Sequence, residues 1–294
     1  MRLHLVDGTY ELYRAHYAPR PGHTAPDGQD CKATVGLLAS MLALIHEAEE
    51  EVTHLAVAFD NPIRSFRNDL FPFYKSDEGV PPELRAQFDL VEEGVRALGV
   101  TVWSMDRYEA DDALATGARK FAREVDQVRI MTPDKDLGQC IDGDRVVQVD
   151  RRQKKVINEA AFRALRGFAP AYMPDYLALT GDTADGFPGL PGFGEKSSGL
   201  LVGAYGRLEK IPPHAHLWTV KPRGALQLAA TFAQHHEEAF LYRKLATLVD
   251  DVPLAESLDD LAFRGVPRAE FEGFCARVGS DNLRQMPRRF ADET

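Results

Sequence analysis

The chain has 294 residues, of which 44% are hydrophobic and 27% charged, and its formal net charge is −10. This composition is typical of a globular protein with enough apolar residues for one large or two modest cores. Three cysteines without a C-x-x-C spacing argue against a disulfide framework or a zinc knuckle. Because the sequence has no run of about 18 apolar residues and no cleavable signal at its start, we expect no membrane segment and a cytoplasmic setting.

Four strand-like runs in the first half each lead into carboxylates. They are Leu3–Val6 before Asp7, Leu55–Phe59 before Asp60, Val100–Met105 before Glu109, Asp111 and Asp112, and Val128–Met131 before Asp134 and Asp136. Helix-like segments at residues 31–51 and 110–125 alternate with these runs, which predicts a mostly parallel α/β sheet. Sites in such sheets form outside the carboxyl ends of the strands, so these acids should converge on one place.

Between the second and third runs lies a charged insertion, residues 61–99, which is too long for a simple connection. Its front part carries basic and aromatic side chains suited to holding a phosphodiester, with Tyr74 offering a stacking face; they are Arg64, Arg67, Tyr74 and Lys75. Further on, acids outnumber bases, and a solvated charged helix is an equal interpretation. We expect the insertion to form a mobile cover over the strand ends.

From about residue 157 the strand signal fades, and helix-like segments predict a mainly α-helical second half. Asp182 and Asp185 precede a glycine-rich turn at Gly189–Ser198. A short turn between two helices exposes backbone N–H groups that can cradle a phosphate, as helix–hairpin–helix motifs do. The turn is no Walker A loop, because Glu195 separates Gly194 from Lys196.

Nine carboxylates gathered in one place would repel one another unless hard cations neutralised them. Setting these nine aside leaves 35 basic against 36 acidic residues, so an anionic partner is compatible with the composition. Two divalent cations about 4 Å apart can activate a water and stabilise both oxygens of a phosphoryl displacement. Any single aspartate would more often be a cap or a solvated loop residue, but the whole set at successive strand ends predicts a metal site.

At these residues the chain resembles the bacterial 5′-nuclease family, which comprises the 5′→3′ exonuclease domain of DNA polymerase I and its flap-endonuclease relatives. Order and spacing agree across about 250 residues. The matching stretches are Val6-Asp7-Gly8 with Arg14, Phe59-Asp60 through Phe66-Arg67, Tyr74-Lys75, Tyr108 to Asp112, Thr132 to Leu137, Leu179 to Asp185, Gly189–Lys196 and Arg243 to Thr247.

The resemblance implies a PIN-like, mostly parallel sheet flanked by helices, with a helical arch inserted at about residues 68–98. It also implies a mainly α C-terminal helix–three-turn–helix domain. The catalytic domain would then cover residues 1–170, and residues 171–294 would form a DNA-binding domain with a motif of the helix–hairpin–helix type.

The family's site residues carry over to matching positions of this chain. Two Mg²⁺ or Mn²⁺ ions are implied in each active site, one held by Asp7, Asp60, Glu109, Asp111 and Asp112, the other by Asp134, Asp136, Asp182 and Asp185. Lys75 and Arg14 would have catalytic roles in steadying the scissile phosphate. DNA would be bound by Arg67, Tyr74, Gly192, Gly194, Lys196 and Ser197, with a K⁺ ion at the glycine-rich turn.

The implied function is a divalent-metal-dependent 5′→3′ exonuclease and flap endonuclease that hydrolyses phosphodiester bonds at the 5′ ends of DNA flaps, junctions or duplexes. RNA primers stay open as a further substrate. No polymerase domain follows, so we expect a separate DNA polymerase as a partner. Two alternatives remain: a catalytically weak DNA-junction binding module, and a PIN-type ribonuclease, which would leave the turn at Gly189–Lys196 unexplained.

The chain departs from the family pattern in three ways. Ser76-Asp77-Glu78 follows Lys75 where an arginine is usual, and the stretch Lys75–Val100 carries six acids against three bases. Gly186 stands where asparagine is common. The acidic arch predicts weaker threading of a 5′ single strand, because the strand is itself anionic.

Overall fold

The structure is a computed structural model and describes residues 1–293. Packing divides the chain into two compact units, each assembled from separate segments. The first unit comprises Met1–Arg64, Asp77–Thr132 and the chain from Asp250 onward, and the second comprises Ser65–Ser76 and Pro133–Val249. This division reflects packing alone and does not test the predicted boundary near residue 170 between a catalytic and a DNA-binding part, which stays a prediction.

The first unit contains four parallel strands in the order β3-β2-β1-β4. Their bounds are β1 Arg2–Asp7, β2 His54–Asp60, β3 Thr101–Met105 and β4 Gln127–Met131. Every residue of β2 is buried, as expected for a central strand of a parallel sheet covered on both faces. The four runs that the sequence predicts as strands are confirmed, with ends shifted by no more than one residue.

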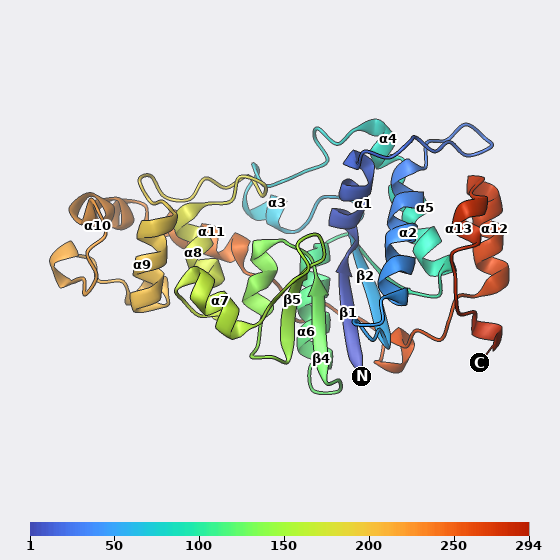
Figure 1. Cartoon of the computed structure of the whole chain (residues 1–294). Helices are drawn as coiled ribbons and strands as arrows, with labels where there is room; N and C mark the ends of the chain where they lie inside the picture. Colours follow the sequence, from blue (N-terminus) through green and yellow to red (C-terminus); the bar gives the residue numbers. More distant parts are fainter. Residues whose placement is uncertain (294) are drawn as a thin grey trace. The chain divides into compact units, whose positions relative to one another are not determined.

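Helices surround these strands (Figure 1). α6 (Ala110–Phe121) packs on all four strands, while α1 (Gly8–Tyr17) contacts β2 and α5 (Phe88–Ala97) contacts β3. α2 (Lys32–His46) lies between α1 and α5 and contacts both. The strand-to-helix alternation confirms the predicted α/β class.

The rear of the charged insertion forms α5, preceded by the short α4 (Pro82–Arg85). Phe88, Val91 and Val95 of α5 are fully buried. This part of the insertion is therefore an amphipathic helix that covers the sheet, and its charges lie mostly on the remaining faces.

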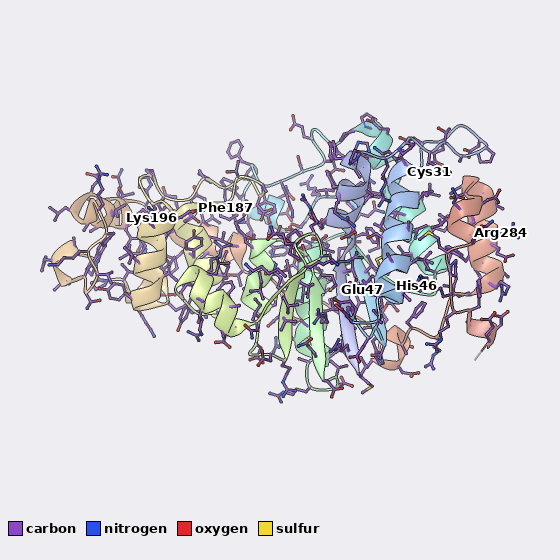
Figure 2. The ribbon with its side chains drawn as sticks, in the orientation of Figure 1. Cys31, His46, Glu47, Phe187, Lys196 and Arg284 are labelled. Carbon is purple, nitrogen blue, oxygen red and sulfur yellow. The ribbon has the colours of Figure 1, made fainter. Side chains whose placement is uncertain are left out.

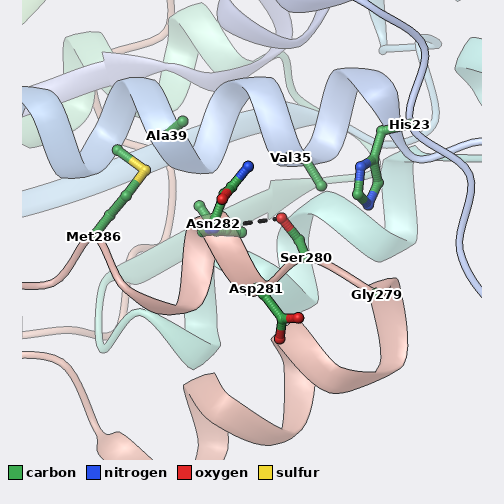
Figure 3. A pocket seen from close by; sticks show the side chains of 9 residues that line it. His23, Val35, Ala39, Gly279, Ser280, Asp281, Asn282 and Met286 are labelled. Atoms are coloured by element: carbon green, nitrogen blue, oxygen red, sulfur yellow. Dashed lines mark hydrogen bonds between the residues drawn. The ribbon is translucent and has the colours of Figure 1, made fainter.

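The C-terminal segment returns to the first unit, where α12 (Arg268–Val278) contacts α5 and α13 (Asp281–Arg284) contacts α2. A cavity of about 380 Å³ lies between α2 and this segment, lined by residues that include His23, Val35 and Met286 (Figure 3). Two 3-10 helices complete the segment, η5 (Asp259–Leu261) and η6 (Ala291–Glu293). None of the residues predicted for the site lines this cavity.

The second unit is mainly helical, as the sequence predicts. Its elements are α3 Arg67–Leu70, η1 Lys135–Cys140, β5 Val146–Asp150, β6 Lys155–Ile157, α7 Glu159–Arg166, η2 Pro170–Tyr172, α8 Met173–Thr180, α9 Glu195–Tyr205, η3 Leu208–Lys210, η4 Ala215–Leu217, α10 Ala225–Gln234 and α11 His236–Ala246. The basic, hairpin-like run at residues 151–155 joins the antiparallel pair β5 and β6: residues 151–154 form the connection, and Lys155 begins β6.

An aromatic-rich core holds this unit together, with α8 packed against α9 and α11. Phe187, labelled in Figure 2, is fully buried. It stacks on Tyr242, and the two ring centroids are 5.7 Å apart. Because α8 is anchored on two sides, the loop that leaves it at Gly181 starts from a fixed point. Within residues 1–293, no helix combines the length and hydrophobicity that crossing a membrane requires.

Candidate functional site

Asp7 ends β1 and caps the helix that follows. Its Oδ1 accepts a hydrogen bond from the Tyr10 N–H (2.8 Å), and its Oδ2 accepts one from the Thr132 hydroxyl (3.0 Å). Thr132 directly follows β4, the strand that pairs with β1. Two neighbouring strand ends therefore fix this carboxylate, which is 6% exposed.

Asp60 ends β2 and faces the start of α6. Its Oδ1 accepts a hydrogen bond from the Ala110 N–H at 2.8 Å. The positive end of the helix dipole favours a charged carboxylate at this position. The backbone N–H of Asp60 donates to the Thr9 hydroxyl (2.8 Å), which ties the strand end to α1.

Glu109 and Asp112 cap α6 reciprocally. The Glu109 side chain accepts from the N–H of Asp112, while Asp112 Oδ2 accepts from the N–H of Glu109 at 3.0 Å. This capping box satisfies two N–H groups that the helix cannot satisfy itself. Both predicted metal ligands therefore have a structural role as well, whereas Asp111, between them, is half-buried in the first turn.

Arg14 lies in α1 beside a buried acid that the sequence analysis missed. Its Nη2 donates to the Glu11 carboxylate and to the Ser40 hydroxyl (2.8 Å), and Ser40 also donates to Glu11 (3.1 Å). Glu11 is only 2% exposed. The spacing of three residues, which places two side chains on one face of a helix, was the available signal for this pair.

In the second unit, three predicted ligands come together. Asp136 lies in η1, and Asp182 and Asp185 lie in the loop after α8. One oxygen from each lies within 4.8 Å of the others. Among the described residues this trio is the acidic group found close enough to share one metal ion.

Lys135 supplies the counter-charge on one side of the trio, and sequence reasoning missed it. Its ammonium donates to the Asp182 carboxylate and lies 3.4 Å from Oδ1 of Asp136. Its position in the sequence, between the predicted ligands Asp134 and Asp136, could have indicated that it lies beside the site. The pairing with Asp182, 47 residues away, was not readable from the sequence.

Tyr74 and Lys75 approach the trio from the other side. The Tyr74 hydroxyl donates to Asp185 Oδ2 (3.1 Å), and the Lys75 ammonium lies 3.4 Å from Asp185 Oδ1. Tyr74 is 4% exposed, so its ring is packed in the core, and its prediction as a DNA-stacking face stays untested.

Because Gly186 has no side chain, the loop after α8 can approach the segment around Phe73 and Lys75 closely. Gly186 has φ +83°, and a Cβ there would lie 2.3 Å from the Phe73 carbonyl oxygen. The Lys75 N–H donates to the Asp185 carbonyl next to it at 3.1 Å. An asparagine, common at this position in the family, would collide here.

The charges within the trio depend strongly on each other. Burial and the nearby carboxylate of Asp134 raise the pKa of Asp136 well above its ordinary value. Burial alone would lower the pKa of Lys135, but the carboxylates of Asp136 and Asp182 raise it, so the lysine is charged. Asp134 itself is exposed and caps η1, accepting from the Asp136 N–H at 2.9 Å.

Arg67, predicted to contact DNA, has a buried guanidinium. Its Nε donates to the Leu245 carbonyl (2.8 Å) and its Nη2 to the Thr247 carbonyl (3.0 Å), at the end of α11. The side chain is 1% exposed, which fits a structural role. A direct contact with DNA stays an untested prediction.

The glycine-rich turn leads into α9. Gly192 has φ +83°, a conformation that favours glycine, and Gly194 is the N-cap residue. The Gly194 N–H donates to the Ser197 hydroxyl at 3.0 Å, while the Lys196 side chain is exposed on the first turn of α9 (Figure 2). The geometry suits contact with an anion, since the N-terminus of α9 carries partial positive charge.

The trio fits a divalent cation. Its donors are carboxylate oxygens, which hard cations such as Mg²⁺ prefer. Asp136 is 6% exposed, and within residues 1–293 no donor is hydrogen-bonded to its Oδ1. The Lys135 ammonium lies 3.4 Å away and forms no hydrogen bond with this oxygen, so a cation that coordinated it would satisfy an acceptor that is costly to leave unsatisfied. The donor set therefore indicates use of a divalent metal.

Family models match nearly the whole chain. The model described as "5'-3' exonuclease, N-terminal resolvase-like domain" matches residues 2–167. The model described as "5'-3' exonuclease, C-terminal SAM fold" matches residues 168–269.

Curated relatives are longer than this chain. DNA polymerase I of Bacillus caldotenax is 33% identical over 282 residues, which cover 95% of this chain and 31% of the relative. DNA polymerase I of Pseudomonas aeruginosa is 37% identical over 271 residues, or 90% of this chain and 29% of the relative. The chain thus spans about a third of the length of these relatives.

Solved structures share the fold at low identity. The 5′-exonuclease of bacteriophage T5 with bound zinc ions has a TM-score of 0.65 at 15% identity, covering 95% of this chain and 98% of its own. The catalytic core of Rad2 in complex with a DNA substrate has a TM-score of 0.60 at 14% identity, covering 97% and 90%. With both family models aligned in order from residue 2 to residue 269, the chain belongs to the 5′→3′ exonuclease family, as its sequence pattern predicts.

Proposed function

We propose that this chain is a divalent-metal-dependent 5′→3′ exonuclease and flap endonuclease that acts on the 5′ ends of DNA duplexes, flaps and junctions. The observation that carries the proposal is the close approach of three carboxylates, Asp136, Asp182 and Asp185. One oxygen of the buried Asp136 accepts no hydrogen bond within residues 1–293. Its position in a chain of the 5′→3′ exonuclease family makes phosphodiester hydrolysis the reaction this cluster would serve.

Each unit would hold one cation, Mg²⁺ or Mn²⁺. In the second unit the trio with Asp134 would hold it. In the first unit the ligands would be Asp7, Asp60, Glu109, Asp111 and Asp112. Such cations, when bound, supply a water that is more acidic than bulk water and stabilise charge on phosphoryl oxygens.

The chain's own side chains prepare these ligands. The Thr132 hydroxyl orients Asp7, the Ala110 N–H orients Asp60, and the Tyr74 hydroxyl orients Asp185. Lys75 and Arg14 would offset the charge of the scissile phosphate. Lys75 is 24% exposed and Arg14 is 32% exposed, so both remain accessible to an anion.

DNA would be held through its phosphates. The turn at Gly192–Ser197 would grip duplex backbone, with a K⁺ ion and Lys196 adding positive charge. Because phosphates carry no sequence information, recognition should follow junction shape. Solved structures of this fold that contain DNA support DNA over RNA as the substrate, and RNA primers remain a further substrate to test. Within residues 1–293 no disulfide joins any of the three cysteines, which is consistent with a reducing, cytoplasmic setting.

A 5′-labelled flap oligonucleotide tests the proposal. The wild type should release the flap with Mg²⁺ and leave it intact with a chelator. Asp134→Ala should abolish release while a mobility shift shows that the DNA is still bound. Glu237→Ala, an exposed acid on α11, is the matched control and should cut normally.

Other outcomes would point to the alternatives. An intact flap with both Mg²⁺ and Mn²⁺, together with a mobility shift, would replace the enzyme with a DNA-junction binding module. Cleavage of an RNA strand without cleavage of the DNA flap would indicate a PIN-type ribonuclease.

A further inference from the structure

Lys135 has an unusual position for a lysine beside a cation site. It begins η1, between Asp134 and Asp136 in the sequence. Its ammonium forms an ion pair with Asp182 and lies 3.4 Å from Oδ1 of Asp136. The oxygen of Asp136 that accepts no hydrogen bond thus faces a cation supplied by the chain itself.

Charge balance explains what this ammonium does. Three carboxylates with oxygens within 4.8 Å repel one another. Asp136 and Asp182 share the single positive charge of Lys135, and Lys75 lies 3.4 Å from the third carboxylate, Asp185. Two ammonium groups therefore balance most of the trio's formal charge.

The two partners of Lys135 differ from it in exposure. The Lys135 side chain is 37% exposed, against 8% for Asp136 and 6% for Asp182. A lysine ammonium sits on a flexible four-carbon stem and is well hydrated in water. It can therefore leave the carboxylates for solvent while they stay in place.

We propose that Lys135 is an exchangeable counter-ion: its ammonium occupies the place between Asp136 and Asp182 that a divalent cation takes, and the cation must displace it to bind. The inference rests on the proposed function of the trio as a metal site. Lys135 acts here as a positioning residue, because it holds the carboxylates together in the metal-free protein. It also lowers the affinity of the site for metal by the free energy of the ion pairs that must break.

Mn²⁺ binding to the purified chain tests this directly, measured by calorimetry and by the electron paramagnetic resonance signal of free Mn²⁺. Lys135→Met removes the charge at similar side-chain length, so Mn²⁺ no longer has to break the ion pairs of Lys135. Because solvent screens these half-buried ion pairs less than surface ones, Mn²⁺ binding at the trio should tighten about tenfold or more. Lys135→Arg keeps the charge and should leave the affinity near that of the wild type or weaken it. Lys210→Met, at an exposed lysine of the same unit, controls for the change in net charge.

Stability gives a second readout. Without metal, Lys135→Met should melt at a lower temperature than the wild type, because the trio has lost its counter-charge. Saturating Mn²⁺ should remove that difference. Unchanged or weaker Mn²⁺ binding by Lys135→Met would overturn the proposal.

Should Lys135→Met not fold, the wild type still decides the matter by NMR. The side-chain ¹⁵Nζ signal of Lys135, assigned by its absence in Lys135→Arg, should be protected from exchange without metal and lose that protection with Mg²⁺. Protection that persists at saturating Mg²⁺ would contradict displacement.

Asp182→Asn separates this inference from the proposed function. If Asp182→Asn removes one Mn²⁺ from the wild type but Lys135→Met tightens nothing, only the counter-ion proposal fails. If Asp182→Asn changes no Mn²⁺ binding at all, the trio is not a metal site and both fail.

Discussion

The acids of the two units are held in different ways. In the first unit, carboxylates at the strand ends accept hydrogen bonds from fixed donors, such as Thr132 for Asp7 and the Ala110 N–H for Asp60. In the second unit, Asp182 and Asp185 also accept hydrogen bonds, from the Ala184 N–H and the Tyr74 hydroxyl, but the charge of the trio is balanced by the ammonium groups of Lys135 and Lys75. Donors held by the backbone or by packing stay in place, whereas the ammonium of an exposed lysine can move away.

This difference has a consequence for metal binding. The carboxylates of the first unit are oriented by hydrogen bonds that persist when a cation arrives, so their geometry is set in advance. The trio must exchange one positive charge for another. We therefore expect the folded state of the second unit to respond to divalent ions more than that of the first.

The largest expected effect comes from replacing one acid in each unit. Asp60→Asn and Asp182→Asn should each reduce flap cleavage more than ~100-fold, since even outer partners of metal ligands cost up to about that factor. The amide oxygen introduced by Asp60→Asn would still accept from the Ala110 N–H, so this variant should melt like the wild type. Asp182→Asn should lose most of the stabilisation that Mg²⁺ gives the wild type, as measured by thermal melting with and without the ion.

The opposite melting results would contradict the proposed difference between the two units. A melting temperature several degrees lower for Asp60→Asn, or an undiminished Mg²⁺ response in Asp182→Asn, would show that the two units do not differ in this way.

A buried ionic group in the first unit provides an intermediate effect. Glu50 Oε2 lies 2.9 Å from His4 Nε2 and 2.7 Å from Arg129 Nε. Burial alone would raise the pKa of Glu50, but these two partners lower it to about 2 from 4.5. Because the folded pKa lies below the unfolded one, the stabilisation is complete above pH 4.5 and is lost as the pH falls from 4.5 towards 2.

Glu50→Gln should therefore lower the free energy of unfolding by about 2 kcal/mol at pH 7, a typical value for hydrogen bonds to charged groups. Its urea denaturation curves at pH 7, 4.5 and 3 should show a flatter loss of stability in acid than the wild type. The exposed Glu49→Gln is the control. Mg²⁺ should shift the acid transitions of the wild type and of Glu50→Gln equally, and a Mg²⁺-dependent change in the difference between the two would contradict the view that Glu50 is permanently paired.

The smallest expected effect concerns the cap of α6. Asp112→Ala removes the acceptor for the Glu109 N–H and should cost about 1 kcal/mol, or roughly 2–4 °C in melting temperature. Asp112→Asn keeps an acceptor and should melt close to the wild type. Equal melting of Asp112→Ala and the wild type would mean that the cap contributes nothing to the fixed geometry of the first unit.

Several parts of the site were predictable because they depend on neighbours in sequence. Asp7 and Asp60 follow buried apolar runs, and such runs form parallel strands whose ends share one edge. Gly192 and Gly194 lie directly before α9, as expected for a glycine-rich turn between helices. The strands, the α/β class and the family are confirmed for these reasons.

Other parts depend on residues that are far apart in the sequence. Arginine is usually a surface residue, yet the guanidinium of Arg67 is buried and donates to carbonyls about 180 residues away in the sequence. Tyr74 belongs to a stretch suited to stacking on bases, yet its hydroxyl holds Asp185, 111 residues away. Local pattern contains no information about such partners.

The sequence alone determined which acids end the strands, where the glycine-rich turn lies and which family the chain belongs to. These features follow from local periodicity, glycine placement and motif order. Only the tertiary structure decided which carboxylates share a cluster, which are bound by backbone donors and which face a lysine. The physical reason is that charge pairing in a folded chain depends on distances in space, and packing rather than sequence neighbourhood sets those distances.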